Sequence, residues 1–170
     1  MEWILSVMAE DRPGLLERIA RCVQNHQGNW EESSLARLAG RFAGIIRITL
    51  PESQGDALRH ALLDLVEYGL QVQIQPGSSQ PLPNRRKVFL DLLGQDQPGI
   101  VKEITTILAA LEVNIEKLDT QVESGSMSGE LMFRALARLS VPDELDLDVL
   151  KSNLEAIAND LMVDISLRQD

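Results

Sequence analysis

Two copies of the pattern Asp-x-Pro-Gly are the residues of this chain with the clearest potential for binding chemistry. Aspartate suits the N-cap of a helix, and proline suits its first turn. Glycine in a first turn lowers helix propensity by up to about 1 kcal/mol relative to alanine, so it needs another reason. A missing Cβ lets a ligand approach free backbone amides, and a helix N-terminus attracts an anion such as an amino-acid carboxylate. The pattern therefore predicts helix caps, either alone or combined with a cradle for a small ligand. The two copies read Asp11-Arg12-Pro13-Gly14 and Asp96-Gln97-Pro98-Gly99.

Catalytic and metal chemistry have few residues to draw on. The chain contains one cysteine, Cys22, and two histidines, His26 and His60. A metal site or an activated nucleophile needs clustered partners, and these three residues do not supply a cluster. Cys22 falls on the apolar face of a predicted helix, which favours a place in the core. We therefore expect no catalytic residue, no metal site and no cofactor, and hence not an enzyme.

The charge balance argues against a nucleic-acid partner. Acidic residues number 26 and basic residues 16, giving a net charge of −10. A protein that binds DNA needs a basic face to neutralise phosphates. The single cysteine fits a reducing compartment, and no apolar run approaches the roughly 20 residues needed to span a bilayer. The sequence therefore predicts a cytoplasmic protein that contacts neither nucleic acid nor membrane.

An internal repeat determines the organisation of the chain. Residues 2–34 align with residues 87–119 in character along nearly the whole stretch, and after a short insertion the match resumes up to Pro51 and Pro142. A duplication explains this better than chance. The identical pairs are Leu5 with Leu90, Asp11 with Asp96, Pro13 with Pro98, Gly14 with Gly99, Ile19 with Ile104, Asn29 with Asn114, Glu31 with Glu116, Phe42 with Phe133 and Arg47 with Arg138.

Hydrophobic periodicity predicts the same order of elements, β-α-β-β-α-β, in each copy. This is the ferredoxin-like unit of the α+β class, with an antiparallel sheet. The insertion, 121–129, is predicted to be a loop. In the first copy the predicted strands are 3–8, 30–38, 42–50 and 70–74, and the helices are 15–23 and 58–66. In the second copy the strands are 88–93, 114–122, 130–140 and 163–167, and the helices are 100–111 and 145–160.

The repeat divides the chain into domains 1–76 and 87–170, joined by a linker at 77–86 that is rich in Pro, Gly and Ser. Units of about 80 residues are marginally stable alone, so we expect the two to pack on each other. Several strands are apolar on both faces, for example at Ile45 and Ile46. Something should cover the open sheet face or edge, either the other copy or a second chain, so a homodimer is possible.

Two βαββαβ units, each with Asp-x-Pro-Gly after strand one and an asparagine at the start of strand two, resemble ACT domains, the small-molecule sensing modules of amino-acid metabolism. The resemblance implies a ligand held at a domain interface, its carboxylate on loop amides and its ammonium or carboxylate on an asparagine. Because Arg12 is replaced by Gln97 in the second copy, the two sites need not be equivalent. The residues that it implies for ligand binding are Asp11, Arg12, Pro13, Gly14, Leu15, Asn29, Asp96, Gln97, Pro98, Gly99, Ile100 and Asn114.

The tandem arrangement, with no attached catalytic domain, resembles transcriptional regulators that carry this domain. The resemblance implies a sensor of a small amino acid, glycine as the first expectation, that acts through a transcriptional activator protein without touching DNA. Three alternatives stay open. The chain could be a regulatory subunit of an amino-acid biosynthetic enzyme, a relative of folate-dependent hydrolases without their catalytic half, or a protein that has lost ligand binding and kept only a protein contact.

Overall fold

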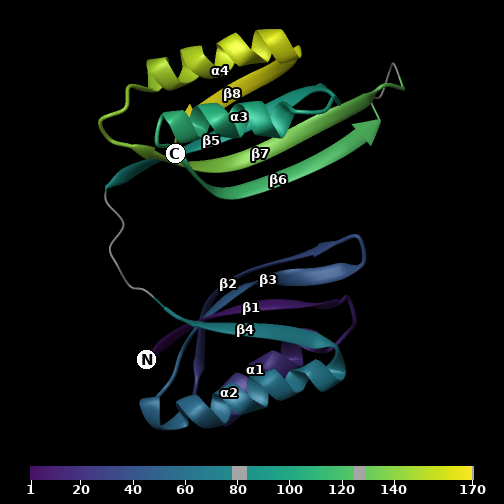
Figure 1. Ribbon diagram of the computed structural model, residues 1–170, viewed down its shortest axis with the longest axis vertical. Helices are drawn as coiled ribbons and strands as arrows, with labels where there is room; N and C mark the ends of the chain where they lie inside the picture. The colour runs from purple at the N-terminus through teal and green to yellow at the C-terminus, as the bar shows by residue number, and fades with distance from the viewer. Residues whose placement is uncertain (78–83, 125–128, 170) are drawn as a thin grey trace. The chain divides into compact units, whose positions relative to one another are not determined.

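The computed structural model describes residues 1–77, 84–124 and 129–169, and they form two compact units, Met1–Gln80 and Pro81–Asp170 (Figure 1). Unit 1 contains β1 (Glu2–Glu10), α1 (Leu15–Asn25), β2 (Asn29–Leu38), β3 (Arg41–Thr49), the 3-10 helix η1 (Glu52–Gln54), α2 (Gly55–Leu63), the 3-10 helix η2 (Asp64–Tyr68) and β4 (Leu70–Pro76). Unit 2 contains β5 (Arg85–Gln95), α3 (Ile100–Ala110), β6 (Asn114–Ser124), β7 (Leu131–Pro142), α4 (Leu147–Leu161) and β8 (Val163–Gln169).

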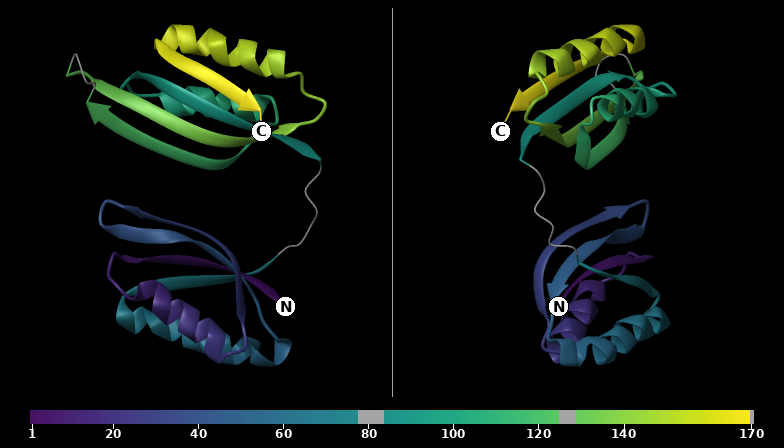
Figure 2. Two further views of the ribbon diagram at one scale, coloured as in Figure 1. Left: turned by 180° about the vertical axis from the view of Figure 1, so that it is seen from behind. Right: turned by 60° about the vertical axis from the view of Figure 1, so that its left-hand side comes forward.

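Each unit is a four-stranded antiparallel sheet with its helices on one face. The strand orders are β2-β3-β1-β4 and β6-β7-β5-β8, so the first strand of each unit lies between the third and the fourth. Figures 1 and 2 show α1 and α2 covering one face of the first sheet, and α3 and α4 covering one face of the second. The α+β class and the two ferredoxin-like units predicted from the sequence are thereby confirmed.

Each core lies between the sheet and its helices. Alternate residues of a strand point to opposite faces, and on β1 it is the odd-numbered residues, such as Leu5 and Val7, that are buried. On α1 the residues Ile19 and Val23 fall on one side of the helix and are also buried. The predicted core position of Cys22 is confirmed, because its side chain joins the same cluster.

Three local details differ from the sequence-based prediction. The second helix of unit 1 was predicted to run to Val66 as one apolar stripe, but α2 ends at Leu63 and continues as η2. The tighter 3-10 winding turns Val66 away from the core, and it is 61% exposed. In unit 2 the strand predicted to end at 122 runs on to Ser124 in β6, so Glu123 and Ser124 of the predicted loop are strand, while 125–128 of that loop fall outside the described residues. β5 begins at Arg85, and 78–83 of the predicted linker also fall outside the described part.

Methionine at position 162 offers a stability test within the repeat. Met162 and Gly69 each follow the last helical turn of their unit, with φ of 51° and 77°. A left-handed φ costs a side-chain-bearing residue about 1–2 kcal/mol, and glycine avoids most of that cost. Because Met162 is 73% exposed, its side chain contributes little packing in return. We expect Met162→Gly to raise the free energy of unfolding of unit 2 by about 1 kcal/mol, measured by urea denaturation with far-ultraviolet circular dichroism. The reciprocal Gly69→Met should lower the stability of unit 1 by a similar amount, and equal stabilities in all three proteins would contradict the argument.

The sheet faces that no helix covers carry exposed apolar side chains in both units. On unit 1 these include Met8 and Ile45, which are 52% and 53% exposed. On unit 2 they are Phe89, Leu93 and Leu136. The sequence-based expectation of strands that are apolar on both faces therefore holds within each unit.

A candidate ligand-binding loop in each unit

The two Asp-x-Pro-Gly segments form equivalent loops, one between β1 and α1 and the other between β5 and α3. In each unit the backbone N–H of the aspartate donates to a carbonyl at the hairpin beside it. Asp11 bonds to Gly40 at 3.0 Å, and Asp96 bonds to Leu131 at 2.8 Å. The repeat therefore holds both loops against their sheets in the same way.

The predicted role of aspartate as the helix N-cap is wrong. The N-cap residues are Gly14 and Gly99, and no side chain caps either helix. The Asp11 carboxylate instead accepts a hydrogen bond from Nε of Arg37 at 2.5 Å. The first-turn amides of α1 and α3 thus have no side-chain acceptor, and they lie at the positive end of a helix dipole.

The structure also changes the explanation of the two glycines. Gly14 and Gly99 have φ of 88° and 102°, a left-handed conformation that favours glycine. A Cβ at either position would have no other heavy atom within 4 Å. Backbone conformation therefore accounts for both glycines, and neither is required by close approach of another group within the protein.

A hollow of about 380 Å³ lies against the first loop. Its volume falls in the range of small-molecule sites. The structure thereby brings together five of the six residues predicted for ligand binding in unit 1. The hollow is lined by Asp11, Arg12, Pro13, Gly14 and Leu15 from the prediction, together with Leu16, Glu17 and Phe42.

The predicted asparagines do not join these loops within their own units. Asn29 pairs with Thr49, which pairs with Glu2 at the start of β1, whereas the loop follows Glu10 at the end of β1. The separation is the length of that strand, roughly 26 Å at about 3.3 Å per residue. The same register places Asn114 opposite Ser140, far from its own loop. One small ligand cannot contact the loop and the asparagine of the same unit.

Asn29 has a local partner instead. Its Nδ2 donates to Oε1 of Glu31 at 2.8 Å, and the hydroxyl of Thr49 donates to the same oxygen at 2.9 Å. These two hydrogen bonds hold the pKa of Glu31 below its ordinary value. In this structure Asn29 therefore helps to fix the end of the β2–β3 pair.

The two loops differ at the position where the sequences differ. In unit 2, Nε2 of Gln97 donates to the carbonyl oxygen of Leu161, the last residue of α4, at 2.5 Å. In unit 1, Nη2 of Arg12 instead lies 2.6 Å from Oε2 of Glu10, and both side chains are more than half exposed. The expectation that the two sites need not be equivalent has a structural basis in this difference.

Sequence reasoning missed a second hollow, of about 270 Å³, that Arg12 also lines. It is lined by Glu10, Arg12, Arg41, Tyr68 and Gly69. Glu10 and Arg41 lie directly opposite each other on β1 and β3. Comparison of the repeats could have found them, because the corresponding residues of unit 2 are uncharged.

Neither nucleophilic nor metal chemistry finds support among the described residues. Burial raises the pKa of the Cys22 thiol, and the negative charge of Asp64 raises it further, so the thiol stays protonated. Nδ1 of His26 and Nδ1 of His60 each lie within hydrogen-bond distance of a backbone carbonyl in their own helix. In the described ranges no three His, Cys, Asp or Glu residues are grouped so that they could hold a metal ion, and no helix is long and apolar enough to cross a bilayer.

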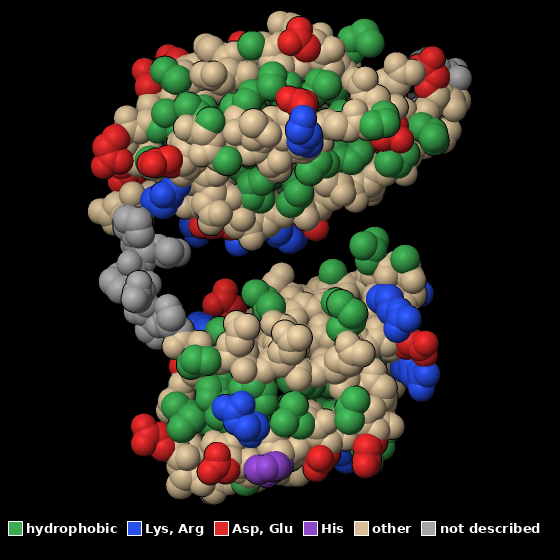
Figure 3. Space-filling model, viewed as in Figure 1, with side chains coloured by type: hydrophobic (Ala, Val, Ile, Leu, Met, Phe, Trp, Pro, Cys, Tyr) green, Lys and Arg blue, Asp and Glu red, His purple; other side chains and the backbone are tan. Residues whose placement is uncertain are grey.

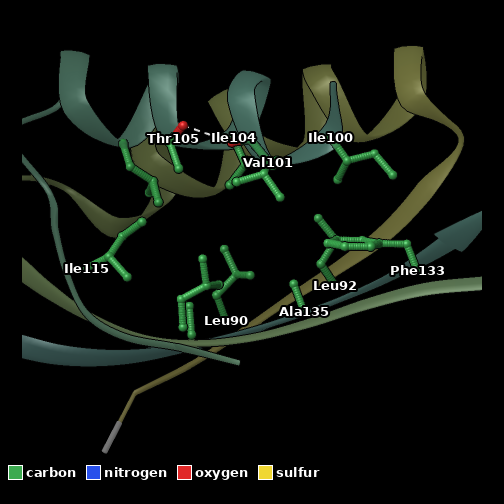
Figure 4. A pocket seen from close by; sticks show the side chains of 12 residues that line it. Leu90, Leu92, Ile100, Val101, Ile104, Thr105, Ile115, Phe133 and Ala135 are labelled. Carbon is green, nitrogen blue, oxygen red and sulfur yellow. Dashed lines mark hydrogen bonds between the residues drawn. The ribbon is translucent and has the colours of Figure 1, made fainter. Parts of the chain in front are cut away.

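A small cavity in unit 2 is too apolar to hold an amino acid. It measures about 20 Å³ and lies between α3 and the sheet, where Ile100 and Ile104 point toward Leu90 and Leu92 (Figure 4). The one polar side chain in its wall, Thr105, donates its hydroxyl hydrogen bond to carbonyls of its own helix. A cavity of this size with apolar walls offers no partner for a charged group or a water molecule, so it is a packing gap.

Comparison with known proteins agrees with the fold. Residues 3–75, which lie within the first unit, match the family model of the ACT domain. The second unit has the same strand order and the same Asp-x-Pro-Gly loop. The protein is therefore built from two ferredoxin-like units, the first of which is similar to the ACT domain.

Among sequence relatives, the chain is similar to the glycine cleavage system transcriptional repressors of Escherichia coli (strain K12) and Shigella flexneri. Each is 29% identical over 127 residues, an alignment that spans 71% of this chain and 64% of the relative. Among solved structures, an unknown protein from Galdieria sulphuraria has a TM-score of 0.85 and 29% identity, covering 99% of this chain and 98% of that one. A candidate glycine cleavage system transcriptional repressor has a TM-score of 0.74 at 19% identity, covering 99% and 96%, and shows the same fold.

Proposed function

We propose that this protein is an amino-acid-sensing regulator that binds glycine or a similarly small amino acid and acts on transcription through a protein partner. The observation that carries the proposal is the hollow of about 380 Å³ against the first Asp-x-Pro-Gly loop, lined by five of the residues predicted for ligand binding. The names of the relatives from Escherichia coli and Shigella flexneri support glycine metabolism as the context. The chain covers less than two thirds of their length, at 64%.

The loop is suited to the carboxylate of an amino acid. The first-turn amides after Gly14 have no side-chain cap, and the helix dipole adds positive potential at that point. Arg12 lies in the wall of the same hollow and supplies a guanidinium group. Asn29 takes no part in this hollow, because strand register places it at the other end of β1.

Action through a protein partner, and not through DNA, agrees with the electrostatics. The net charge is −10, which opposes binding to a phosphate backbone. On the face drawn in Figure 3, Lys and Arg side chains are scattered in small groups among Asp and Glu. The partner of this proposal is a transcriptional activator protein, and the exposed apolar side chains on the open sheet faces, such as Phe89 and Ile45, are suited to such a contact. The proposal assigns no enzymatic activity to the chain.

The test is a titration of the purified protein with each of the twenty amino acids. Trp3 and Trp30, the two tryptophans of the chain, both lie in unit 1, so tryptophan emission during unfolding reports on that unit alone. A ligand at 100 times its Kd stabilises by about 2.7 kcal/mol, and we expect glycine to raise the emission-detected midpoint accordingly.

A matched pair of variants ties the effect to the loop. Leu16→Phe adds bulk to the wall of the hollow at a helical position, without backbone strain, and should weaken the response at least tenfold. Val101→Phe places the same bulk at the corresponding position of unit 2 and should leave the unit 1 response unchanged. If no amino acid shifts the midpoint, sensing is wrong for unit 1. The next experiment then uses the purified protein, immobilised, to capture an activator protein in the presence and absence of glycine. Capture that does not depend on glycine would mean that only the protein contact remains.

A further inference from the structure

Three charged side chains meet at one corner of unit 1, which we call the arginine corner: Glu10, Arg12 and Arg41. They line the hollow of about 270 Å³ together with Tyr68 and Gly69. Glu10 and Arg41 are direct cross-strand neighbours, so their side chains leave the same face of the sheet about 5 Å apart at Cβ. Arg12 reaches Glu10 from the loop at 2.6 Å.

The arginine corner contains more positive than negative charge. Two guanidinium groups face one carboxylate, and both hold the pKa of Glu10 below its ordinary value, Arg12 more strongly than Arg41. Glu10 can neutralise only one of them. The corner therefore has one positive charge in excess, in a hollow with room for a small molecule, and a guanidinium can bind a carboxylate or phosphate through two parallel hydrogen bonds.

The second unit provides an internal comparison in which every one of these charges is absent. Glu10 corresponds to Gln95 and Arg41 to Met132, since both pairs occupy the same register position on their sheets. Arg12 corresponds to Gln97, which spans the corner by its hydrogen bond to Leu161. The duplicated fold is thus stable with a neutral, bridged corner, and folding alone does not require the charges of unit 1.

We propose that the arginine corner of unit 1 binds a small oxyanion, with the carboxylate of an amino acid as the source best matched to it, and that the corresponding corner of unit 2 does not. Arg12 and Arg41 hold the anion, and Glu10 faces the ammonium group when the ligand is an amino acid. Tyr68 forms one wall, and its ring is fixed by Arg18, whose guanidinium lies 4.2 Å from the ring centre. Arg12 borders both hollows of unit 1.

The experiment exchanges residues between the repeats. Glycine, acetate and inorganic phosphate are titrated at low ionic strength, where screening is weakest, and followed by calorimetry and by tryptophan emission. The variants Arg12→Gln and Arg41→Met give unit 1 the residues of unit 2. Each should weaken binding of the anion at least tenfold. The control Arg21→Gln removes an equal charge from an exposed arginine of the same unit, paired with Glu17, and should change binding less than twofold.

A further variant distinguishes the source of the anion. Glu10→Gln removes the internal competitor for the arginines, so acetate and phosphate should bind more tightly. Glycine should bind more weakly, because the partner of its ammonium group is lost. The arginine corner is overturned if none of the three compounds binds, or if Arg41→Met leaves their affinity within twofold of the parent protein. If glycine binds Arg41→Met with the parent affinity, the proposal for the arginine corner is wrong, but the proposal of amino-acid sensing is retained. If phosphate or acetate binds, Arg41→Met abolishes that binding and glycine does not bind, the arginine corner is supported and amino-acid sensing by unit 1 is wrong.

Discussion

Gly44→Ala is expected to destabilise unit 1 by about 3 kcal/mol, at the upper end of the range for overpacking. Gly44 lies in β3, where β2 approaches closely. A Cβ there would lie 2.1 Å from the carbonyl oxygen of Ser34 and 2.7 Å from Cα of Leu35. Both atoms belong to the backbone of β2, so no side-chain rotation relieves the overlap and the strand itself must move. The measurement is urea unfolding followed by the emission of Trp3 and Trp30.

The duplicated unit supplies the control for this variant. Ala135 is the corresponding residue of β7, and there a Cβ is accommodated with 6% of the residue exposed. Ala135→Gly should cost no more than about 1 kcal/mol, from the greater backbone freedom of glycine, and should leave the tryptophan transition unchanged. If Gly44→Ala lowers the free energy of unfolding no more than the control does, β2 can move away from the added Cβ at little cost, and the expectation is wrong.

Most of the fold could be predicted because the repeat tests each interpretation twice. The periodicity of the strands and helices, read in two copies, gave the correct order of elements, and the core position of Cys22 followed from one helical stripe. The errors were local. Sequence spacing could not distinguish an aspartate that caps a helix from one that bonds Arg37, since both precede the helix by a few residues. Nor could it show that η2 would turn Val66 outward.

The candidate site was predicted only in part, and for a physical reason. The residues of the loop are consecutive, so finding the loop found Asp11 to Leu15 together. Arg41 and Tyr68 are distant in sequence and reach the loop only through strand register and the end of η2. Asn29 does not join this loop within its own unit, because strand register places it at the other end of β1. Residue type identifies chemistry, but register decides which groups meet.

The two units are therefore alike in fold and unlike in surface chemistry. Unit 1 has an exposed ion pair at its loop, whereas unit 2 uses Gln97 to tie its loop to α4. Each loop thus has a contact with another element of its own unit, since Arg37 of β2 bonds Asp11 in unit 1, but the charged groups Arg12 and Glu10 are present in unit 1 alone. This difference in surface chemistry makes each unit testable separately.

Leu154→Ala is expected to destabilise unit 2 by about 3 kcal/mol. Leu154 is fully buried, at 0% exposure, in the core beneath α4, and truncation of such a leucine leaves a cavity that costs roughly 2–5 kcal/mol. A domain of about 85 residues has a total stability of roughly 4–13 kcal/mol, so this single change removes a large share. Because both tryptophans lie in unit 1, the measurement is urea unfolding by far-ultraviolet circular dichroism, with tryptophan emission recorded alongside.

The matched control is Val149→Ala, in the same helix but 45% exposed, which should cost less than about 1 kcal/mol. Equal losses in the two variants would contradict the buried position of Leu154. Anion binding by the Leu154→Ala variant tests in addition whether the arginine corner depends on the core of unit 2. Loosening α4 weakens the hydrogen bond from Gln97 to the carbonyl of Leu161 in unit 2. Every residue of the arginine corner, however, belongs to unit 1. Below its own unfolding transition, Leu154→Ala should therefore bind the corner's anion with the parent affinity, because the binding groups and the destabilised core lie in different units.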